Sequence, residues 1–99
     1  MALAIAKHRI DDNLVITLEG RLDSTNSQEL MDTISNSLQG VTDLVIDLEK
    51  LEYMSSAGIR QLVATHKQIN SALTLKHVSP EIMDVLRVTG LDKKLNIEP

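Results

Sequence analysis

Cysteine, tryptophan and phenylalanine are all missing from this chain of 99 residues, and Tyr53 is its one aromatic residue. Without cysteine the chain forms no disulfide, holds no thiolate metal site and carries no cysteine nucleophile. A lone aromatic ring excludes the stacked platforms that bind single-stranded nucleic acid and the aromatic cages that bind organic cations. No apolar run approaches the roughly 18–20 residues of a membrane span. We therefore expect no membrane segment and a cytoplasmic location.

Positive charge is also scarce. Ten lysines and arginines face fourteen aspartates and glutamates, which gives a formal net charge of −4. An acidic surface repels phosphate backbones, so we expect no nucleic acid partner. The apolar fraction of 42% supports one modest core, and a chain of this size builds a single domain. We expect residues 1–99 to form one domain that acts as a monomer.

Short apolar runs predict the strands. Alternating apolar residues from Leu3 to Arg9 and from Leu14 to Glu19 predict two strands of a hairpin, the second ended by Gly20. A continuous apolar centre between Val41 and Leu48 predicts a third strand that is buried on both faces. The stretch from Leu73 to Val78 predicts a fourth strand.

Three stretches with apolar residues every three or four positions predict helices. Each follows residues that cap helices well, and two of them end at a glycine. They run from a cap among Ser24, Thr25 and Asn26 to Gly40, from about Ser56 to Asn70, and from the cap Ser79 to Gly90. A short apolar piece after Gly90 closes the chain.

The element order is therefore β-β-α-β-α-β-α. Strands that alternate with helices are joined by right-handed crossovers and form a parallel sheet. We expect an α/β fold, with a four-stranded, mostly parallel sheet, an antiparallel edge strand from the hairpin, and helices packed on it. Functional loops of such sheets follow the carboxyl ends of the strands. Here these loops are residues 20–24 and 50–56, and we expect them to be neighbours.

Two adjacent serines, Ser55 and Ser56, stand where the second helix is predicted to begin. Unpaired backbone N–H groups and the positive end of the helix dipole meet at such a point. A serine there caps the helix through its hydroxyl or, once phosphorylated, presents a dianion that the N–H groups can bind. The residues alone leave both roles open. The two roles are compatible if Ser55 caps the helix and Ser56 is modified.

Three residues near these serines are candidates for contact. Asp23 belongs to the loop expected beside Ser56, so its carboxylate is a candidate hydrogen-bond partner for the serine hydroxyl. Tyr53 and Met54 precede the helix, where they either close the core or offer a small apolar anchor to a partner protein.

Nothing in the sequence indicates a catalytic or metal centre. The three histidines, His8, His66 and His77, lie on separate elements without the spacing of metal ligands, so we expect no metal and no cofactor. The residues around Ser56 do not form a G-x-S-x-G elbow, and no general base is evident. A small serine hydrolase is therefore the least favoured alternative, and we expect no enzyme activity.

Four segments together resemble the STAS domain and, more closely, the bacterial anti-sigma factor antagonists. The segments are Leu18-Glu-Gly-Arg-Leu-Asp23, Leu44-Val-Ile-Asp47-Leu48, Tyr53-Met-Ser-Ser-Ala-Gly-Ile59 and Val85-Leu-Arg-Val-Thr-Gly-Leu-Asp92. The resemblance spans nearly the whole chain, and the order of elements agrees with it.

This resemblance implies a phosphorylation switch. It places Ser56 at the phosphoacceptor position, followed by the small residue Ala57 and by Gly58. The chain departs from the family pattern at Ser55, where aspartate is usual, and at Arg60, where a small residue is common. The implied partner is an anti-sigma factor with serine kinase activity, which the unmodified protein binds to free a sigma factor. A serine phosphatase would restore binding after phosphorylation.

From the resemblance and the expected neighbouring loops together, we predict a switch surface around the phosphoacceptor Ser56. Its members are Asp23, Ser24, Tyr53, Met54, Ser55, Ala57, Gly58 and Arg60. A second function that the resemblance allows is that of a stand-alone STAS subunit of a lipid-transport ABC system, because Ser55 replaces the usual aspartate.

Overall fold

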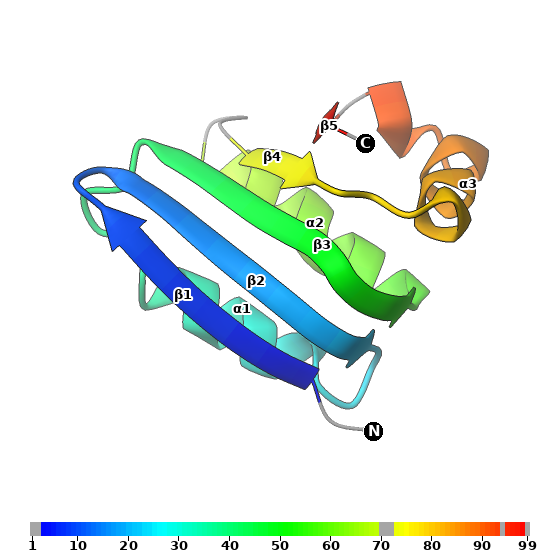
Figure 1. The fold of residues 1–99 in the computed structure, drawn as a ribbon, viewed down its shortest axis with the longest axis horizontal. Helices are drawn as coiled ribbons and strands as arrows, with labels where there is room; N and C mark the ends of the chain where they lie inside the picture. Colours follow the sequence, from blue (N-terminus) through cyan, green and yellow to red (C-terminus); the bar gives the residue numbers. More distant parts are fainter. Residues whose placement is uncertain (1–2, 70–72, 94, 99) are drawn as a thin grey trace.

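The strands form one mixed sheet, in which each strand lies beside its neighbours in the sequence (Figure 1). The computed structural model describes residues 3–69, 73–93 and 95–98 of the chain. In these ranges the sheet order is β1-β2-β3-β4-β5, with β1 antiparallel to β2 and the other pairs parallel. The strands are β1 (Leu3–Ile10), β2 (Asn13–Leu22), β3 (Asp43–Met54), β4 (Leu73–Lys76) and β5 (Asn96–Glu98).

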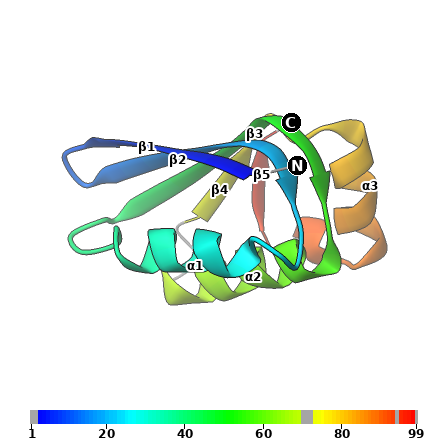
Figure 2. The ribbon, with the colours of Figure 1, turned by 90° about the horizontal axis from the view of Figure 1, so that it is seen from below.

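The sequential strand order determines where the helices lie. A right-handed crossover that always moves to the next strand position places its helix on the same face each time. Accordingly, α1 (Ser27–Ser35) and α2 (Ser56–Gln68) cover one face of the sheet, as Figure 2 shows. Helix α3 (Pro80–Val88) lies beside the end of β3, and a 3₁₀ turn (Leu91–Lys93) leads from it to β5. None of the helices in the described ranges has the length and hydropathy needed to cross a bilayer.

The core lies between the sheet and the two helices that cover it. In β2, Leu14, Ile16 and Leu18 are buried, whereas Val15 and Thr17 on the opposite face are partly exposed. The helices bury a matching set of side chains: Leu30 and Ile34 from α1, and Ile59 and Leu62 from α2. Each buried Leu or Ile contributes about 1.5–3 kcal/mol. The other face of the sheet is not covered by these helices. The prediction that the third strand is buried on both faces was wrong, because Val45 and Asp47 on that face of β3 are partly exposed.

Strand β3 is twelve residues long. Its alternation of buried and partly exposed side chains stops after Leu48, but the strand continues to Met54. Its pairing with β2 shifts between Asp47 and Lys50 and again between Leu51 and Tyr53, and each shift leaves one extra residue in β3. Such bulges bend and twist a strand. Beyond them the strand reaches Met54, one residue before the N-cap of α2.

The prediction of four strands was wrong, because the sheet has a fifth strand. Its three residues, Asn96–Glu98, hold a single apolar side chain and give no alternation to detect. Gly20 does not end the second strand: it has a φ of 106° beside a bulge, and β2 continues to Leu22. The loop predicted from Lys50 is strand as far as Met54, because the two bulges disguise it in the sequence.

One helix and one strand end earlier than predicted. Helix α1 ends at Ser35 rather than Gly40, because the next two residues, an asparagine and a serine, favour turns. The fourth strand ends at Lys76 rather than Val78, since the following residue has a left-handed φ of 55°. The predicted end of the second helix, Asn70, lies outside the described residues. The hairpin, the parallel strands and the order of the first seven elements are confirmed.

Candidate switch site at the start of helix α2

Helix α2 begins at the two adjacent serines, and the structure distinguishes them. Ser55 has the extended backbone of an N-cap residue, with φ −84° and ψ 173°. Its hydroxyl accepts a hydrogen bond from the N–H of Gly58 at 3.4 Å, and its carbonyl accepts one from the N–H of Ile59 at 3.0 Å. Ser55 is therefore the capping residue, which confirms one of the two roles that the sequence left open for the pair.

Ser56 is the first residue of α2, and it is exposed. Among the described residues, its hydroxyl has no protein hydrogen-bond partner. The N–H groups of Ser56 and Ala57 also lack a protein acceptor there, because a first helical turn has no preceding turn to bond to. Arg60, one turn further along the helix, is exposed and forms no ion pair in the described ranges. The start of α2 thus combines an accessible hydroxyl, two free donors and an unpaired cation.

Gly58 lets the first turn of α2 approach the sheet closely. A Cβ at this position would lie 2.8 Å from Cγ of Leu22 and 3.0 Å from Cγ of Met54. Leu22 is completely buried, so it has no open space into which to move. The glycine therefore fixes the distance between the start of α2 and the ends of β2 and β3.

The loop after β2 lies against the start of α2, as the sequence predicted. The N–H of Ser55 donates to the carbonyl of Leu22 at 2.9 Å, which joins the two segments directly. The carboxylate of Asp23, a candidate partner for the Ser56 hydroxyl, is occupied elsewhere. It accepts hydrogen bonds from the N–H of Thr25 at 2.9 Å and from the Thr25 hydroxyl at 2.6 Å.

The side chains of Asp23 and Asn26 hold this loop in place through hydrogen bonds. The hydrogen bonds from Thr25 hold the pKa of the Asp23 carboxyl below its ordinary value of 3.8, so the carboxylate is ionised at neutral pH. Asn26 accepts the N–H of Asp23 at 2.9 Å and donates to the carbonyl of Arg21 at 2.8 Å. Asn26, one of the three predicted caps, is the N-cap residue of α1, but its side chain bonds to the loop and to no N–H of the helix. Ser24 is exposed at the tip of the loop.

Nearly the whole chain matches one known domain family. A family model described as the STAS domain matches residues 4–99. The chain belongs to the STAS family. The resemblance inferred from the four sequence segments is thereby confirmed, and it extends over almost the full length of the chain.

Individual STAS relatives agree with this assignment. The chain is 28% identical over 92 residues to BtrV of Bordetella bronchiseptica, a protein provisionally named an anti-sigma factor antagonist; the match covers 89% of this chain and 79% of BtrV. The crystal structure of an anti-sigma factor antagonist from Mycobacterium paratuberculosis superposes with a TM-score of 0.89 at 24% identity, covering 99% of this chain and 86% of the other. The phosphorylated form of the Bacillus cell fate determinant SpoIIAA superposes with a TM-score of 0.75 at 22% identity, covering 97% and 92%. At these identities the two structures establish the STAS fold.

Tyr53 and Met54 of this STAS domain occupy different depths at the end of β3. Tyr53 is 41% exposed, and the guanidinium carbon of Arg21 lies 4.2 Å from the centre of its ring. Met54 is only 6% exposed and lines a small cavity of about 100 Å³ between β3 and α3. The other residues lining the cavity are Glu52, Tyr53, Glu81, Ile82 and Val85. Arg21 was missed from the sequence, because only the β2–β3 register places it beside Tyr53.

The structure thus divides the predicted switch surface by exposure. Four of its residues, counting Ser56, are exposed: Ser24, Tyr53, Ser56 and Arg60. Asp23, Ser55 and Ala57 are partly buried, whereas Met54 and Gly58 are buried.

Proposed function

We propose that this STAS domain is an anti-sigma factor antagonist whose binding is switched off by phosphorylation of Ser56. In this proposal the unmodified protein binds an anti-sigma factor with serine kinase activity and frees a sigma factor. A serine phosphatase removes the phosphate and restores binding. The chain acts as a single domain in the cytoplasm, where sigma factors act. The relative BtrV and the neighbours named as anti-sigma factor antagonists support this choice within the STAS family.

The division of roles between the two serines is the observation that carries the proposal. Ser55 caps α2, so the helix does not need the hydroxyl of Ser56. The exposed Ser56 hydroxyl is then available to a kinase without any loss of helix capping. Ser55 also performs the capping role that aspartate, the usual residue of the family at this position, performs in helices generally. Serine in place of the family's usual aspartate at position 55 is therefore compatible with the switch.

Phosphorylation of Ser56 would change the surface of the domain far more than its stability. A phosphate carries a charge of about −1.5 to −2 at neutral pH and adds three acceptor oxygens. The free N–H groups of Ser56 and Ala57 and the positive end of the α2 dipole favour a negative group at this point. Arg60 supplies an unpaired positive charge one turn away. We therefore expect the phosphorylated domain to remain folded.

The same phosphate would weaken the binding of a protein partner that docks over Ser56. Such a partner must desolvate the dianion or place against it a surface that does not neutralise its charge. Leaving a buried charge without its partner costs roughly 2–5 kcal/mol in protein complexes. That cost corresponds to binding weaker by about 30-fold to several thousand-fold. One modification is then enough to release a partner held with micromolar affinity.

A catalytic role for Ser56 has no support in the geometry. A serine nucleophile needs a general base within hydrogen-bond distance. In the described parts of the chain, no histidine or carboxylate bonds to the Ser56 hydroxyl. We therefore propose a binding function without enzyme activity.

The proposal is tested by phosphorylation and by binding. The protein is incubated with candidate anti-sigma kinases and ATP, and any phosphate is located by mass spectrometry. We expect the phosphate on Ser56. Binding to the same kinase is then measured for Ser56→Ala, which should bind persistently, and for Ser56→Asp, which should bind poorly.

A matched pair, Ser35→Ala and Ser35→Asp, controls for charge alone. Ser35 is an exposed serine at the carboxyl end of α1, so an aspartate there adds the same charge away from the start of α2. Both Ser35 variants should bind like the unmodified protein. Equal binding by Ser56→Ala and Ser56→Asp would contradict the electrostatic switch. Phosphate found on Ser55 would show that Ser55, and not Ser56, is the phosphoacceptor.

A further inference from the structure

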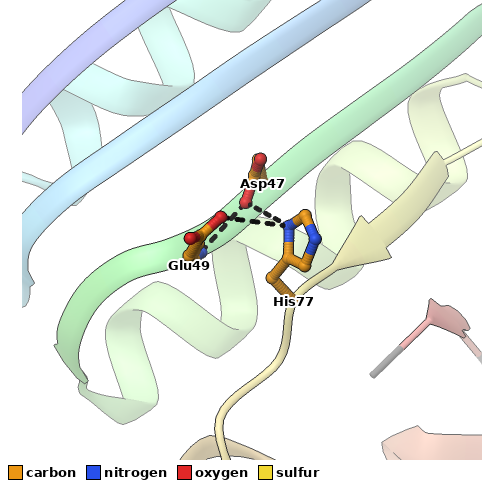
Figure 3. A group of neighbouring side chains, drawn as sticks. All are labelled: Asp47, Glu49 and His77. Atoms are coloured by element: carbon orange, nitrogen blue, oxygen red, sulfur yellow. Dashed lines mark hydrogen bonds and ion pairs between the residues drawn. The ribbon is translucent and has the colours of Figure 1, made fainter.

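Two carboxylates and an imidazole converge on the sheet, away from the start of α2. Asp47 and Glu49 belong to β3, and His77 directly follows β4 (Figure 3). Nδ1 of His77 lies 3.0 Å from Oδ1 of Asp47 and 3.7 Å from Oε2 of Glu49. One potential ligand atom from each of the three residues lies within 4.8 Å of the other two. Spacing along the chain does not indicate this group, because His77 is thirty residues from Asp47.

The strand register explains why the three side chains meet. Asp47 pairs with Lys76, the last residue of the parallel strand β4. His77, the next residue, therefore lies beside Asp47 where β4 ends. The shift in β3 between Asp47 and Lys50 inserts an extra residue at this point, and Glu49 lies within the shifted stretch. The N–H of Glu49 donates to Oδ1 of Asp47 at 3.0 Å, which holds the two acidic residues together.

Two of the three donor–donor distances are close to those found around a small divalent cation. In a tetrahedral site with metal–ligand bonds of about 2.0–2.1 Å, neighbouring donor atoms lie about 3.4 Å apart. The two distances from the His77 nitrogen, 3.0 Å and 3.7 Å, lie on either side of that value. A set of one imidazole and two carboxylates is a nitrogen and oxygen donor set typical of Zn²⁺ and related ions.

The local charge also favours a cation. The carboxylate oxygens of Asp47 and Glu49 lie 3.0 Å and 3.7 Å from Nδ1 of His77, so two acidic groups stand at the same point. The ammonium group of Lys76, the residue before His77, lies 4.0 Å from the carboxylate of Glu98 on β5. A divalent ion at the cluster would therefore face two carboxylates, and the ammonium group that could repel it has an acidic partner of its own.

We propose that Asp47, Glu49 and His77 form a surface site for a divalent transition-metal ion of the Zn²⁺ class. The side chains of His77 and Glu49 are 52% and 66% exposed, so the ion would remain open to solvent on one side and would exchange readily. The open side would take water or a donor from another molecule. The site shares no residue with the switch surface, so it stands independently of the proposed function.

The test is a titration of the metal-free protein with ZnCl₂ at slightly alkaline pH, followed by calorimetry and by amide NMR spectra. We expect a single Zn²⁺ to bind, with the largest amide shifts around residues 47–49 and 76–78. His77→Asn and Asp47→Asn should each weaken binding by about tenfold or more. Asparagine is chosen at His77 because it tolerates the left-handed φ of 55° found there.

Two further variants make the outcome decisive. His8→Ala removes an exposed histidine from β1 and should leave Zn²⁺ binding unchanged. Glu49→Gln alters the most exposed ligand and should weaken binding even if the other variants fold poorly. The site is refuted if wild-type protein shows no saturable binding below millimolar Zn²⁺, if Glu49→Gln binds like wild type, or if His8→Ala abolishes binding.

Discussion

The two ends of the sheet use their positive side chains in different ways. At the β1–β2 hairpin, Arg9 donates from Nε to the carbonyl of Asp11 at 2.8 Å and from Nη1 to the carbonyl of Gln39 at 2.7 Å. Lys7 donates to the Ser37 hydroxyl at 3.2 Å. Helix α2 begins at the opposite end of the sheet (Figure 1). Among the described residues, Arg60 in its first turns has no ion pair and the Ser56 hydroxyl has no hydrogen bond.

This contrast separates groups that hold the fold together from groups that remain available to a partner. The hairpin end uses its donors to tie β1 to the loop that leads into β3. At the α2 end, Arg21 lies over the ring of Tyr53, but the Ser56 hydroxyl, the N–H groups of Ser56 and Ala57, and Arg60 stay free among the described residues. Close packing beneath them keeps that end in place. Substitutions at the two ends should therefore affect different properties of the protein.

The largest effect on stability is expected from Gly58→Ala. The added Cβ would overlap Leu22, which is completely buried, so the first turn of α2 must move or the core must repack. Overpacking of this kind costs about 1–3 kcal/mol of unfolding free energy. Urea denaturation measures the change. Ser56→Ala, at an exposed position two residues earlier, serves as the control and should change stability by less than about 0.5 kcal/mol. Equal stability of the two variants would show that the close approach is not needed.

Loss of the helix cap should have the next largest effect. Ser55→Ala removes the acceptor for the Gly58 N–H and should cost about 1 kcal/mol of unfolding free energy. Ser55→Asp should restore the stability, because aspartate caps helices as well as serine does. Thermal and urea unfolding of the three proteins test the assignment. A larger loss in Ser56→Ala than in Ser55→Ala would reverse the roles of the two serines.

The two arginines test the contrast between the ends directly. Arg9→Met removes two hydrogen bonds to backbone carbonyls and should lower the unfolding free energy by about 0.5–1 kcal/mol. Arg60→Met removes no such bond and should change stability by less than about 0.5 kcal/mol. Binding of the anti-sigma factor should respond in the opposite order, with the larger change in Arg60→Met. Identical responses of both variants in both measurements would remove the distinction.

The smallest expected effect concerns the acidity of Asp23. The two hydrogen bonds from Thr25 stabilise the ionised carboxylate and lower its pKa below 3.8. Because the folded-state pKa is depressed, the associated stabilisation is present at neutral pH and is lost as the pH falls from about 3.9 through the depressed pKa. Thr25→Val removes the hydroxyl donor and should raise the Asp23 pKa toward its ordinary value. An NMR titration of the carboxyl carbon measures both values, and an unchanged pKa would show that the Thr25 hydroxyl is not the main cause.

Much of the fold could be predicted from the sequence, because most of its strands keep a regular pattern. The alternation of Leu14, Ile16 and Leu18 predicted β2, and the apolar centre of the third strand predicted the first half of β3. The second half of β3 was missed, since two bulges change the spacing of its buried residues from two to three. β5 was missed because three residues in an edge strand are too few to form a pattern.

The site was predictable where it depends on neighbours in the sequence and not where it depends on register. The capping of α2 follows from local chemistry, and Ser55 and Ser56 were both found. The contact of Arg21 with Tyr53 and the cluster at His77 arise from pairing between strands, so no spacing along the chain reveals them. The carboxylate of Asp23 was a candidate partner for the Ser56 hydroxyl, but Thr25, only two residues away, is its actual partner.

The most direct test compares one preparation of the protein before and after phosphorylation of Ser56. The unfolding free energy is measured by urea denaturation, and the Kd for the anti-sigma factor is measured on the same samples. We predict an unfolding free energy that is unchanged within about 0.5 kcal/mol or slightly higher, together with affinity lower by about 30-fold or more. Unchanged affinity, or an affinity lost only because the phosphorylated domain unfolds, would contradict the account.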